Sequence, residues 1–197
     1  MKKYSKGLVA SSACLAGFIN RALLNDEYEC INTSNALGII IDFIGGEPLM
    51  EIDLIEQICS YILDTMIEKK HPWLYFCQFS MGSNGILYDT PKVQQFFKKY
   101  GRMFSFSISI DGNKQLHDAC RIDLNGNGTY DRAIAAVHKH KNIFGKIPPT
   151  KMTIAPENVK YLYDAVLNLI KEGYTCIFLN CVYENVWNNN LATILYY

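Results

Sequence analysis

The chain has 197 residues, of which 49% are hydrophobic, 13% aromatic and 19% charged, and its formal net charge is zero. This composition fits one globular domain and excludes an intrinsically disordered or low-complexity chain. The charge balance excludes a strongly basic surface of the kind that binds nucleic acid or anionic membranes. No apolar run approaches the roughly 20 residues that a membrane-spanning helix needs.

The first 34 residues are predicted to form a helical lead-in. Lys2 and Lys3 precede a mildly apolar stretch, which is the outline of a signal peptide. That stretch contains serines and a glycine, however, and Leu8, Leu15 and Ile19 share one helical face. We therefore favour an amphipathic helix over a signal peptide.

From residue 35 onward, strand and helix patterns alternate. Short β-branched or apolar runs predict strands at 38–44, 73–79, 103–110, 151–155 and 175–182. Apolar residues at helical spacing predict helices at 49–69, 91–100, 130–144 and 156–172, with a further helix beginning at 189. Five alternations predict an α/β fold with a mostly parallel sheet. An open doubly wound sheet and a partial (β/α) barrel both fit, and in both the ligands bind beyond the carboxyl ends of the strands.

The segment after the first predicted strand contains two glycines and an acid. Gly45 and Gly46 allow close approach of the backbone to a ligand, and Pro48 removes a donor and stiffens the exit from the turn. Glu47 can accept hydrogen bonds from an ammonium group. A plain glycine turn before a helix fits the spacing equally well. The segment is not a phosphate-binding Walker loop, because no Gly-Lys-Ser/Thr follows.

Polar residues also follow the third predicted strand. Ser109 and Asp111 suit ribose hydroxyls, and Arg121 suits a carboxylate through its forked guanidinium. These residues can also have purely structural roles. In that interpretation, Asp111 is a turn residue, His117 is a surface residue and Arg121 is a solvated ion-pair partner. Sequence alone leaves both interpretations open.

Other polar residues favour structural roles. Asn84 lies in a Ser-Asn-Gly stretch that is typical of turns. His138 and His140 are two residues apart and do not share a helical face, so we expect a solvated helix end and no metal site.

The cysteines do not form a recognisable set of ligands. Their number is odd and their spacing irregular, which argues against a secreted disulfide framework and favours a cytoplasmic protein. The pair Cys176 and Cys181 is too widely spaced for a zinc ribbon, and we expect both side chains to be buried in packing. The seven lie at positions 14, 30, 59, 77, 120, 176 and 181.

Taken in order, the motifs resemble those of radical S-adenosylmethionine (SAM) enzymes. Within that superfamily they are most similar to peptide-modifying maturases related to the anaerobic sulfatase-maturating enzymes, of the type that acts on Cys-repeat peptides. The motifs are Gly-Gly-Glu-Pro (45–48), Ser-Asn-Gly (83–85), Ser-Ile-Asp-Gly (109–112), His-Asp-x-x-Arg (117–121) and Lys-x-Thr-Ile-x-Pro-x-Asn (151–158). Each motif is weak alone, and the ordered set carries the resemblance from about residue 35 to the C-terminus.

The resemblance implies a partial (β/α) barrel that binds SAM and a [4Fe-4S] cluster and forms a 5′-deoxyadenosyl radical. Residues 45–48 (Gly45, Gly46, Glu47 and Pro48) would hold the methionine amino group, Ser109 the ribose and Arg121 the SAM carboxylate. Asn84 would face the substrate, a Cys-rich peptide or protein, and Asp111 would face either the substrate or the adenosyl group.

The chain departs from this family in its cysteines. The family binds its cluster with C-x-x-x-C-x-x-C, which anchors three irons and leaves the fourth open for SAM, and no such triplet occurs here. We therefore expect a barrel core (35–197) truncated at both ends, without its first strand or the auxiliary-cluster domain, and catalytically inactive alone. The rival hypotheses are a non-catalytic SAM- or peptide-binding module and an unrelated nucleotide-binding α/β enzyme. An unpaired edge at 38–44 predicts oligomers or aggregation.

Overall fold

The fold is a single open sheet of five parallel strands with helices packed on it, which confirms the expected partial barrel. The computed structural model describes residues 38–183 and 186–187. The strands lie in sequence order, β1-β2-β3-β4-β5, and every neighbouring pair is parallel. They are β1 (Ile39–Phe43), β2 (Cys77–Ser83), β3 (Phe104–Ile108), β4 (Thr150–Ile154) and β5 (Ile177–Cys181).

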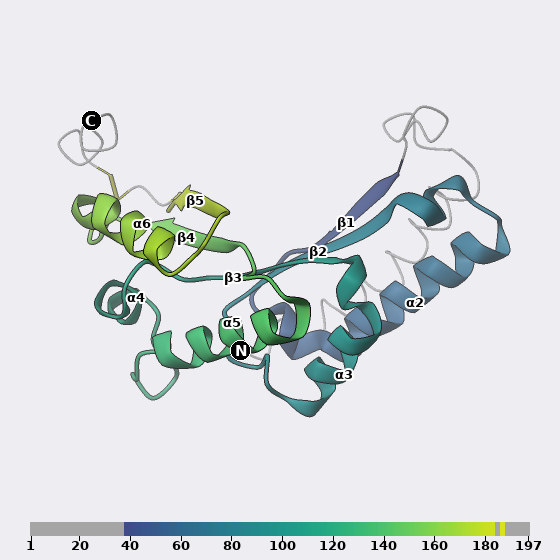
Figure 1. Cartoon of the computed structure of the whole chain (residues 1–197), viewed down its shortest axis with the longest axis horizontal. Coiled ribbons are helices and arrows are strands. Elements are labelled where there is room, and N and C mark those ends of the chain that lie inside the picture. Colours follow the sequence, from purple (N-terminus) through teal and green to yellow (C-terminus); the bar gives the residue numbers. More distant parts are fainter. Residues whose placement is uncertain (1–37, 184–185, 188–197) are drawn as a thin grey trace.

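The helices connect successive strands, and α2, α3 and α5 lie on one side of the sheet (Figure 1). Within the described residues, the α-helices are α2 (Ile52–Glu68), α3 (Pro91–Tyr100), α4 (Lys114–Cys120), α5 (Tyr130–Phe144) and α6 (Leu162–Lys171). Four 3-10 turns join them to the strands: η1 (Pro48–Glu51), η2 (Pro72–Phe76), η3 (Gly101–Met103) and η4 (Val159–Tyr161). The predicted lead-in (1–34) and the helix beginning at 189 lie outside the described residues.

The prediction for the second strand was wrong by four residues. Residues 73–76 belong to the turn η2, and β2 begins only at Cys77. Pro72 opens the turn, and the His71 ring caps it by accepting a hydrogen bond from the Trp73 N–H at 3.2 Å. Trp73 is 1% exposed and enters the core from this turn, whereas Tyr75 and Phe76 are exposed.

Side chains alternate between two faces of the sheet, as the pleat requires. The face toward the helices is apolar and buried, as with Phe79, Met81 and Phe106. The opposite face is polar over β2, β3 and β4. It carries Ser80, Ser105, Ser107, Lys151 and Thr153, and each of these is at least partly exposed.

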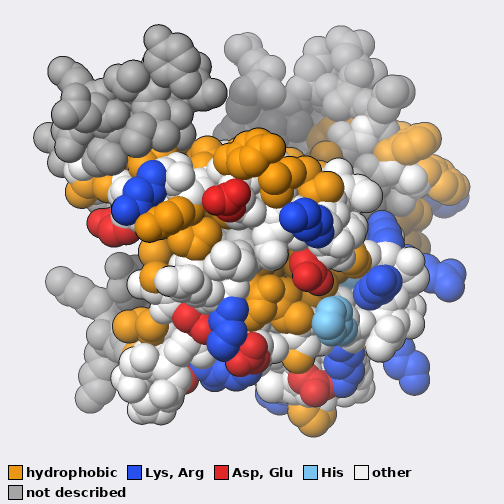
Figure 2. Space-filling model, turned by 60° about the vertical axis from the view of Figure 1, so that its left-hand side comes forward, with side chains coloured by type: hydrophobic (Ala, Val, Ile, Leu, Met, Phe, Trp, Pro, Cys, Tyr) orange, Lys and Arg blue, Asp and Glu red, His pale blue; other side chains and the backbone are white. Residues whose placement is uncertain are grey.

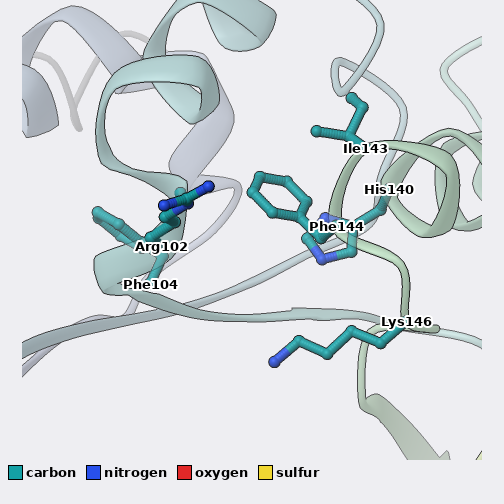
Figure 3. Close-up of a pocket in the computed structure, with 7 residues that line it drawn as sticks. Arg102, Phe104, His140, Ile143, Phe144 and Lys146 are labelled. Atoms are coloured by element: carbon teal, nitrogen blue, oxygen red, sulfur yellow. The ribbon is translucent and has the colours of Figure 1, made fainter.

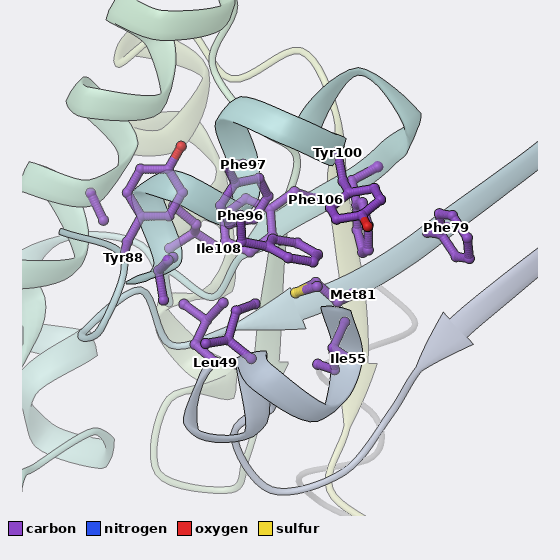
Figure 4. Packing of buried hydrophobic residues seen from close by; sticks show 14 of the residues in the cluster. Leu49, Ile55, Phe79, Met81, Tyr88, Phe96, Phe97, Tyr100, Phe106 and Ile108 are labelled. Atoms are coloured by element: carbon purple, nitrogen blue, oxygen red, sulfur yellow. The ribbon is translucent and has the colours of Figure 1, made fainter. Parts of the chain in front are cut away.

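Aromatic rings fill the core between α3, α5 and the sheet (Figure 4). Phe97 of α3 meets Phe106 of β3 edge to face, with ring centroids 4.6 Å apart. Tyr88, fully buried, stacks on the same Phe106 at 5.4 Å. Such ring pairs add about 0.5–1.5 kcal/mol each beyond area burial, and they fix the sheet against the helices.

The strands β3 and β4 overlap at one register pair only, Ile108 with Thr150. The Thr150 hydroxyl joins them by donating to the Ile108 carbonyl at 2.8 Å and accepting from the Ile110 N–H at 2.9 Å. The strand β4 thus begins where β3 ends, and no strand lies beside the amino-terminal part of β3 on that side within the described residues.

Candidate functional site

The loops at the carboxyl ends of β1 and β2 are tied together by one carboxylate. Glu47 accepts hydrogen bonds from the Ser83 hydroxyl at 2.7 Å, the Asn84 N–H at 2.8 Å and the Leu49 N–H at 3.1 Å. Ser83 is 3% exposed, and its Oγ also accepts from the Gly85 N–H at 2.9 Å. Glu47 therefore caps the turn η1 and fixes the position of the loop before it.

Gly45 and Gly46 form an open lip on this anchored loop. Both residues are exposed, and a Cβ atom built on either would meet no atom within 4 Å among the described residues. The lip has room for a ligand beside its backbone. Pro48, which follows Glu47, is buried and starts η1.

A second carboxylate, Asp111, lies at the carboxyl end of β3 and holds Arg121. Asp111 is 1% exposed, and its two oxygens accept from Arg121 Nε at 2.5 Å and Nη2 at 3.1 Å. The Thr153 N–H donates to the same carboxylate at 2.8 Å, and Arg121 Nη2 also donates to the Thr153 hydroxyl at 3.2 Å. The remaining guanidinium nitrogen, Nη1, makes no hydrogen bond within the described part of the chain, so it can donate to a ligand.

A buried histidine supports this ion pair from behind. His117 accepts from the Asp111 N–H at 3.2 Å through Nδ1, and its Nε2 lies 3.1 Å from the Thr129 hydroxyl. Thr129 donates to the Arg121 carbonyl at 2.9 Å, which closes the network. Burial lowers the pKa of His117 to about 4, so the ring is neutral near pH 7. His117 is 1% exposed, and its interpretation as a surface residue was wrong.

The structure brings the predicted residues to one edge of the sheet. The Ser109 N–H donates to the Ser83 carbonyl at 2.9 Å, which places Ser109 next to the loop that Glu47 anchors. Asn84 accepts from the Ile86 N–H at 2.9 Å through its side-chain oxygen, as in an Asx turn. The ligand roles predicted for Ser109, Asn84, Asp111 and Arg121 stay predictions.

Sequence analysis included Ser83 and Thr153 in its motifs but assigned no role to either, whereas the structure shows that they hold the two carboxylates. Ser83 is the last residue of β2, and Thr153 follows Lys151 on the polar face of β4. Both positions end or nearly end a strand, and that is the signal that could have identified them. The helix α4, which presents His117 and precedes Arg121, was also missed.

Two other expectations were wrong. His140 is 5% exposed and pairs through Nδ1 with the buried Tyr88 hydroxyl at 2.9 Å, so it does not lie at a solvated helix end. Cys176 and Cys181 are both exposed, whereas we expected them to be buried. The strand between them, β5, is the last strand of the described sheet, and its Phe178 and Leu179 are exposed.

Solved structures of an enzyme with bound ligands have the same fold as this chain. Native anSMEcpe with bound AdoMet and Kp18Cys peptide matches with a TM-score of 0.68 and 18% identity, over 91% of this chain and 48% of that chain. Native anSMEcpe with bound AdoMet gives a TM-score of 0.66, 16% identity and coverages of 91% and 47%. Native anSMEcpe with bound AdoMet and Cp18Cys peptide gives a TM-score of 0.65 and 18% identity, over 90% of this chain and 45% of that chain.

The chain has the fold of an anaerobic sulfatase-maturating enzyme. It spans about half the length of these radical SAM structures. No protein-family model matches the sequence, and no curated protein matches it. The likeness to the radical SAM fold therefore rests on structure.

Within residues 38–183 and 186–187, no three side chains of His, Cys, Asp or Glu gather as metal ligands. No described helix combines the length and hydropathy that crossing a bilayer requires. Figure 2 shows charges of both signs mixed on one face, with hydrophobic side chains gathered toward its upper part.

Proposed function

We propose that this chain is the SAM-binding core of a radical SAM enzyme that modifies a peptide or protein. The observation that carries the proposal is the anchored, polar edge formed by residues 45–48, Ser109 and Arg121, on a fold shared with AdoMet-bound structures. The peptide as substrate class is supported by the bound peptides in two of those structures.

The open lip would bind the methionine end of SAM. Backbone atoms of Gly45 and Gly46 would hold the amino group, because the lip is free of side chains. Glu47 has one acceptor position left on Oε2 after its three hydrogen bonds, and its negative charge would attract the ammonium. Pro48 would fix the exit from the lip.

Arg121 would bind the SAM carboxylate. Asp111 and Thr153 occupy Nε and Nη2, so the guanidinium is held in one orientation with Nη1 available. A prepositioned charge loses less entropy on binding than a mobile one. Asp111 would act on the ligand through Arg121, as a positioning residue, and Asn84 would contact the substrate from the neighbouring loop.

SAM fits the described residues, whereas a [4Fe-4S] cluster does not. When bound and reduced by such a cluster, SAM supplies a 5′-deoxyadenosyl radical that takes hydrogen from the substrate. Among the described residues, no three side chains of His, Cys, Asp or Glu gather as metal ligands, and burial raises the pKa of Cys59 to about 12 and that of Cys77 to about 11. The sequence holds no C-x-x-x-C-x-x-C. We therefore propose that the chain alone binds SAM without cleaving it, and that the cluster belongs to a longer parent.

Equilibrium dialysis with labelled SAM tests this proposal. We expect the chain to bind SAM, and Ser109→Ala to weaken binding by about fivefold through loss of one ribose hydrogen bond. Ser105→Ala is the matched control, because it changes the same type of side chain near the start of β3, whereas Ser109 follows the end of that strand. No binding, or equal loss in both variants, would overturn the assignment.

Anaerobic reconstitution with iron and sulfide tests the second part. We expect no 5′-deoxyadenosine from SAM and dithionite. A stoichiometric four-iron cluster with SAM cleavage on this chain would show that the chain is active alone. SAM binding without cleavage agrees equally with a non-catalytic module, and reconstitution together with a cluster-bearing parent protein separates the two.

A further inference from the structure

A pocket lies at the end of the sheet opposite to the candidate SAM site. It has a volume of about 310 Å³, at the lower end of the range of small-molecule sites. It lies beside the start of β3 and the segment before β4, whereas Ser109 follows the end of β3. Its lining residues, most of them drawn in Figure 3, are Gly101, Arg102, Phe104, His140, Ile143, Phe144 and Lys146.

The pocket exists because β3 and β4 are offset. They share only the register pair Ile108 and Thr150, so no strand fills the space beside Phe104. Gly101 also keeps room for a ring, because a Cβ atom at this position would lie 2.4 Å from Phe144 Cζ. The cavity is therefore a consequence of the sheet register and not of a loose loop.

The polar groups of the pocket all donate hydrogen bonds. Arg102 enters from η3 and Lys146 from the segment after α5, and no acidic residue lines the pocket. The Lys146 charge and burial together lower the pKa of His140 to about 4, with burial the larger cause. A pocket that is lined by two cationic side chains and no carboxylate favours an anionic ligand.

His140 adds a third donor. Its Nδ1 pairs with the Tyr88 hydroxyl, which is fully buried and keeps its proton because burial raises the pKa of Tyr88. The hydroxyl has no other side-chain acceptor among the described residues, so it donates to Nδ1 and the ring proton lies on Nε2. Nε2 has no hydrogen-bond partner in residues 38–183, and its ring lines the pocket (Figure 3).

We propose that this pocket is a second ligand site, for a small organic carboxylate with an aromatic or branched apolar body. Arg102 and Lys146 bind the carboxylate, and the His140 Nε2–H donates to it. Phe104, Ile143 and Phe144 contact the apolar body. The apolar wall separates this ligand class from inorganic anions, which would leave the wall in contact with water.

Titration with phenylacetate, followed by NMR of the 15N-labelled chain, tests the proposal. We expect saturable binding that shifts the His140 side-chain resonances, and a loss of affinity of about tenfold in Arg102→Gln. Arg132→Gln is the matched control, since Arg132 lies on α5, pairs with Asp123 at 2.7 Å and does not line the pocket. We expect it to leave the affinity unchanged.

Three further measurements fix the ligand class and the place of binding. The neutral 2-phenylethanol and inorganic phosphate should each bind at least about tenfold more weakly than phenylacetate, because each lacks one half of the recognised chemistry. Saturating SAM should leave phenylacetate affinity unchanged, which separates this site from the proposed SAM site. Equal binding of phosphate, no shift at His140, or equal loss in both arginine variants would overturn the proposal.

Discussion

Glu47 and Ser83 lie 36 residues apart and meet through a 2.7 Å hydrogen bond that joins the loops after β1 and β2. The same carboxylate also receives the Asn84 and Leu49 N–H groups, so one side chain fixes two loops. The open lip at Gly45 and Gly46 thus connects the end of β1 to a residue held by three hydrogen bonds.

Replacing the Glu47 carboxylate tests how strongly it anchors the loops after β1 and β2. We expect Glu47→Gln to lower the free energy of unfolding by about 1–3 kcal/mol, because an amide cannot accept all three hydrogen bonds. Urea unfolding measures the change. Glu51→Gln, at an exposed position on the same turn, is the control, and an equal effect of the two substitutions would argue against the anchoring role.

The ion pair of Asp111 and Arg121 predicts a larger effect. Asp111→Asn leaves the half-buried Arg121 without its counter-charge, and we expect a loss of about 3–5 kcal/mol in the free energy of unfolding. Asp131→Asn breaks an exposed pair with Lys114 and should change stability little. Similar melting temperatures for the two variants would contradict this account.

Two glycines with the same backbone conformation separate strain from packing. Gly112 has φ +85° and Gly126 φ +82°, so alanine is strained at both by about 1–2 kcal/mol. A Cβ at Gly112 would also lie 2.6 Å from the Ala165 Cβ, whereas none lies within 4 Å at Gly126. We expect Gly112→Ala to cost about 1–3 kcal/mol more than Gly126→Ala in chemical denaturation. Equal losses in the free energy of unfolding would mean that α6, which carries Ala165, shifts without cost to accommodate the added methyl group.

Two buried histidines predict an acid-labile fold. The folded-state pKa values of His117 and His140 are about 4, below the usual 6.5, because burial disfavours the charged form. The unfolded chain therefore binds more protons between pH 6.5 and 4, so stability is present above pH 6.5 and is lost as pH falls through that window.

Urea titrations at pH 7, 6 and 5 check this prediction. His117→Asn should flatten the decline, while substitution of the exposed His138 should not. A pH-independent midpoint for the native chain across this range would refute it.

The edge of the sheet at β1 predicts self-association. Ile40 is 68% exposed and Ile44, just beyond the strand, 87%, and β1 has no outer strand neighbour among the described residues. We expect concentration-dependent oligomers by light scattering, and Ile40→Lys should reduce them, since an edge lysine opposes pairing with another chain. A clean monomer at high concentration would count against an open edge.

Periodicity predicted most of the fold, because its strands and long helices have one clear apolar face. The helices α3 and α5 have the predicted bounds, since Pro91 starts one and Gly145 ends the other. The start of β2 was misplaced because an aromatic turn and a buried strand have the same composition. Only tertiary packing of Trp73 distinguishes them.

The candidate site was predicted in its residue types but not in its connections. Gly45, Glu47, Asp111 and Arg121 were recognised from their motifs. The bond from Ser83 to Glu47 and the network through His117 could not be, because they join segments that only the sheet register brings together. The burial of His140 could not be predicted either, because the ring pairs with Tyr88, which lies 52 residues away in the sequence.

The offset of β3 and β4 leaves few backbone ladder bonds in the middle of the sheet. The Thr150 hydroxyl and the Asp111 carboxylate, which receives the Thr153 N–H at 2.8 Å, join the two strands there. At this junction, side chains supply the cohesion that a continuous backbone ladder supplies between the other strands.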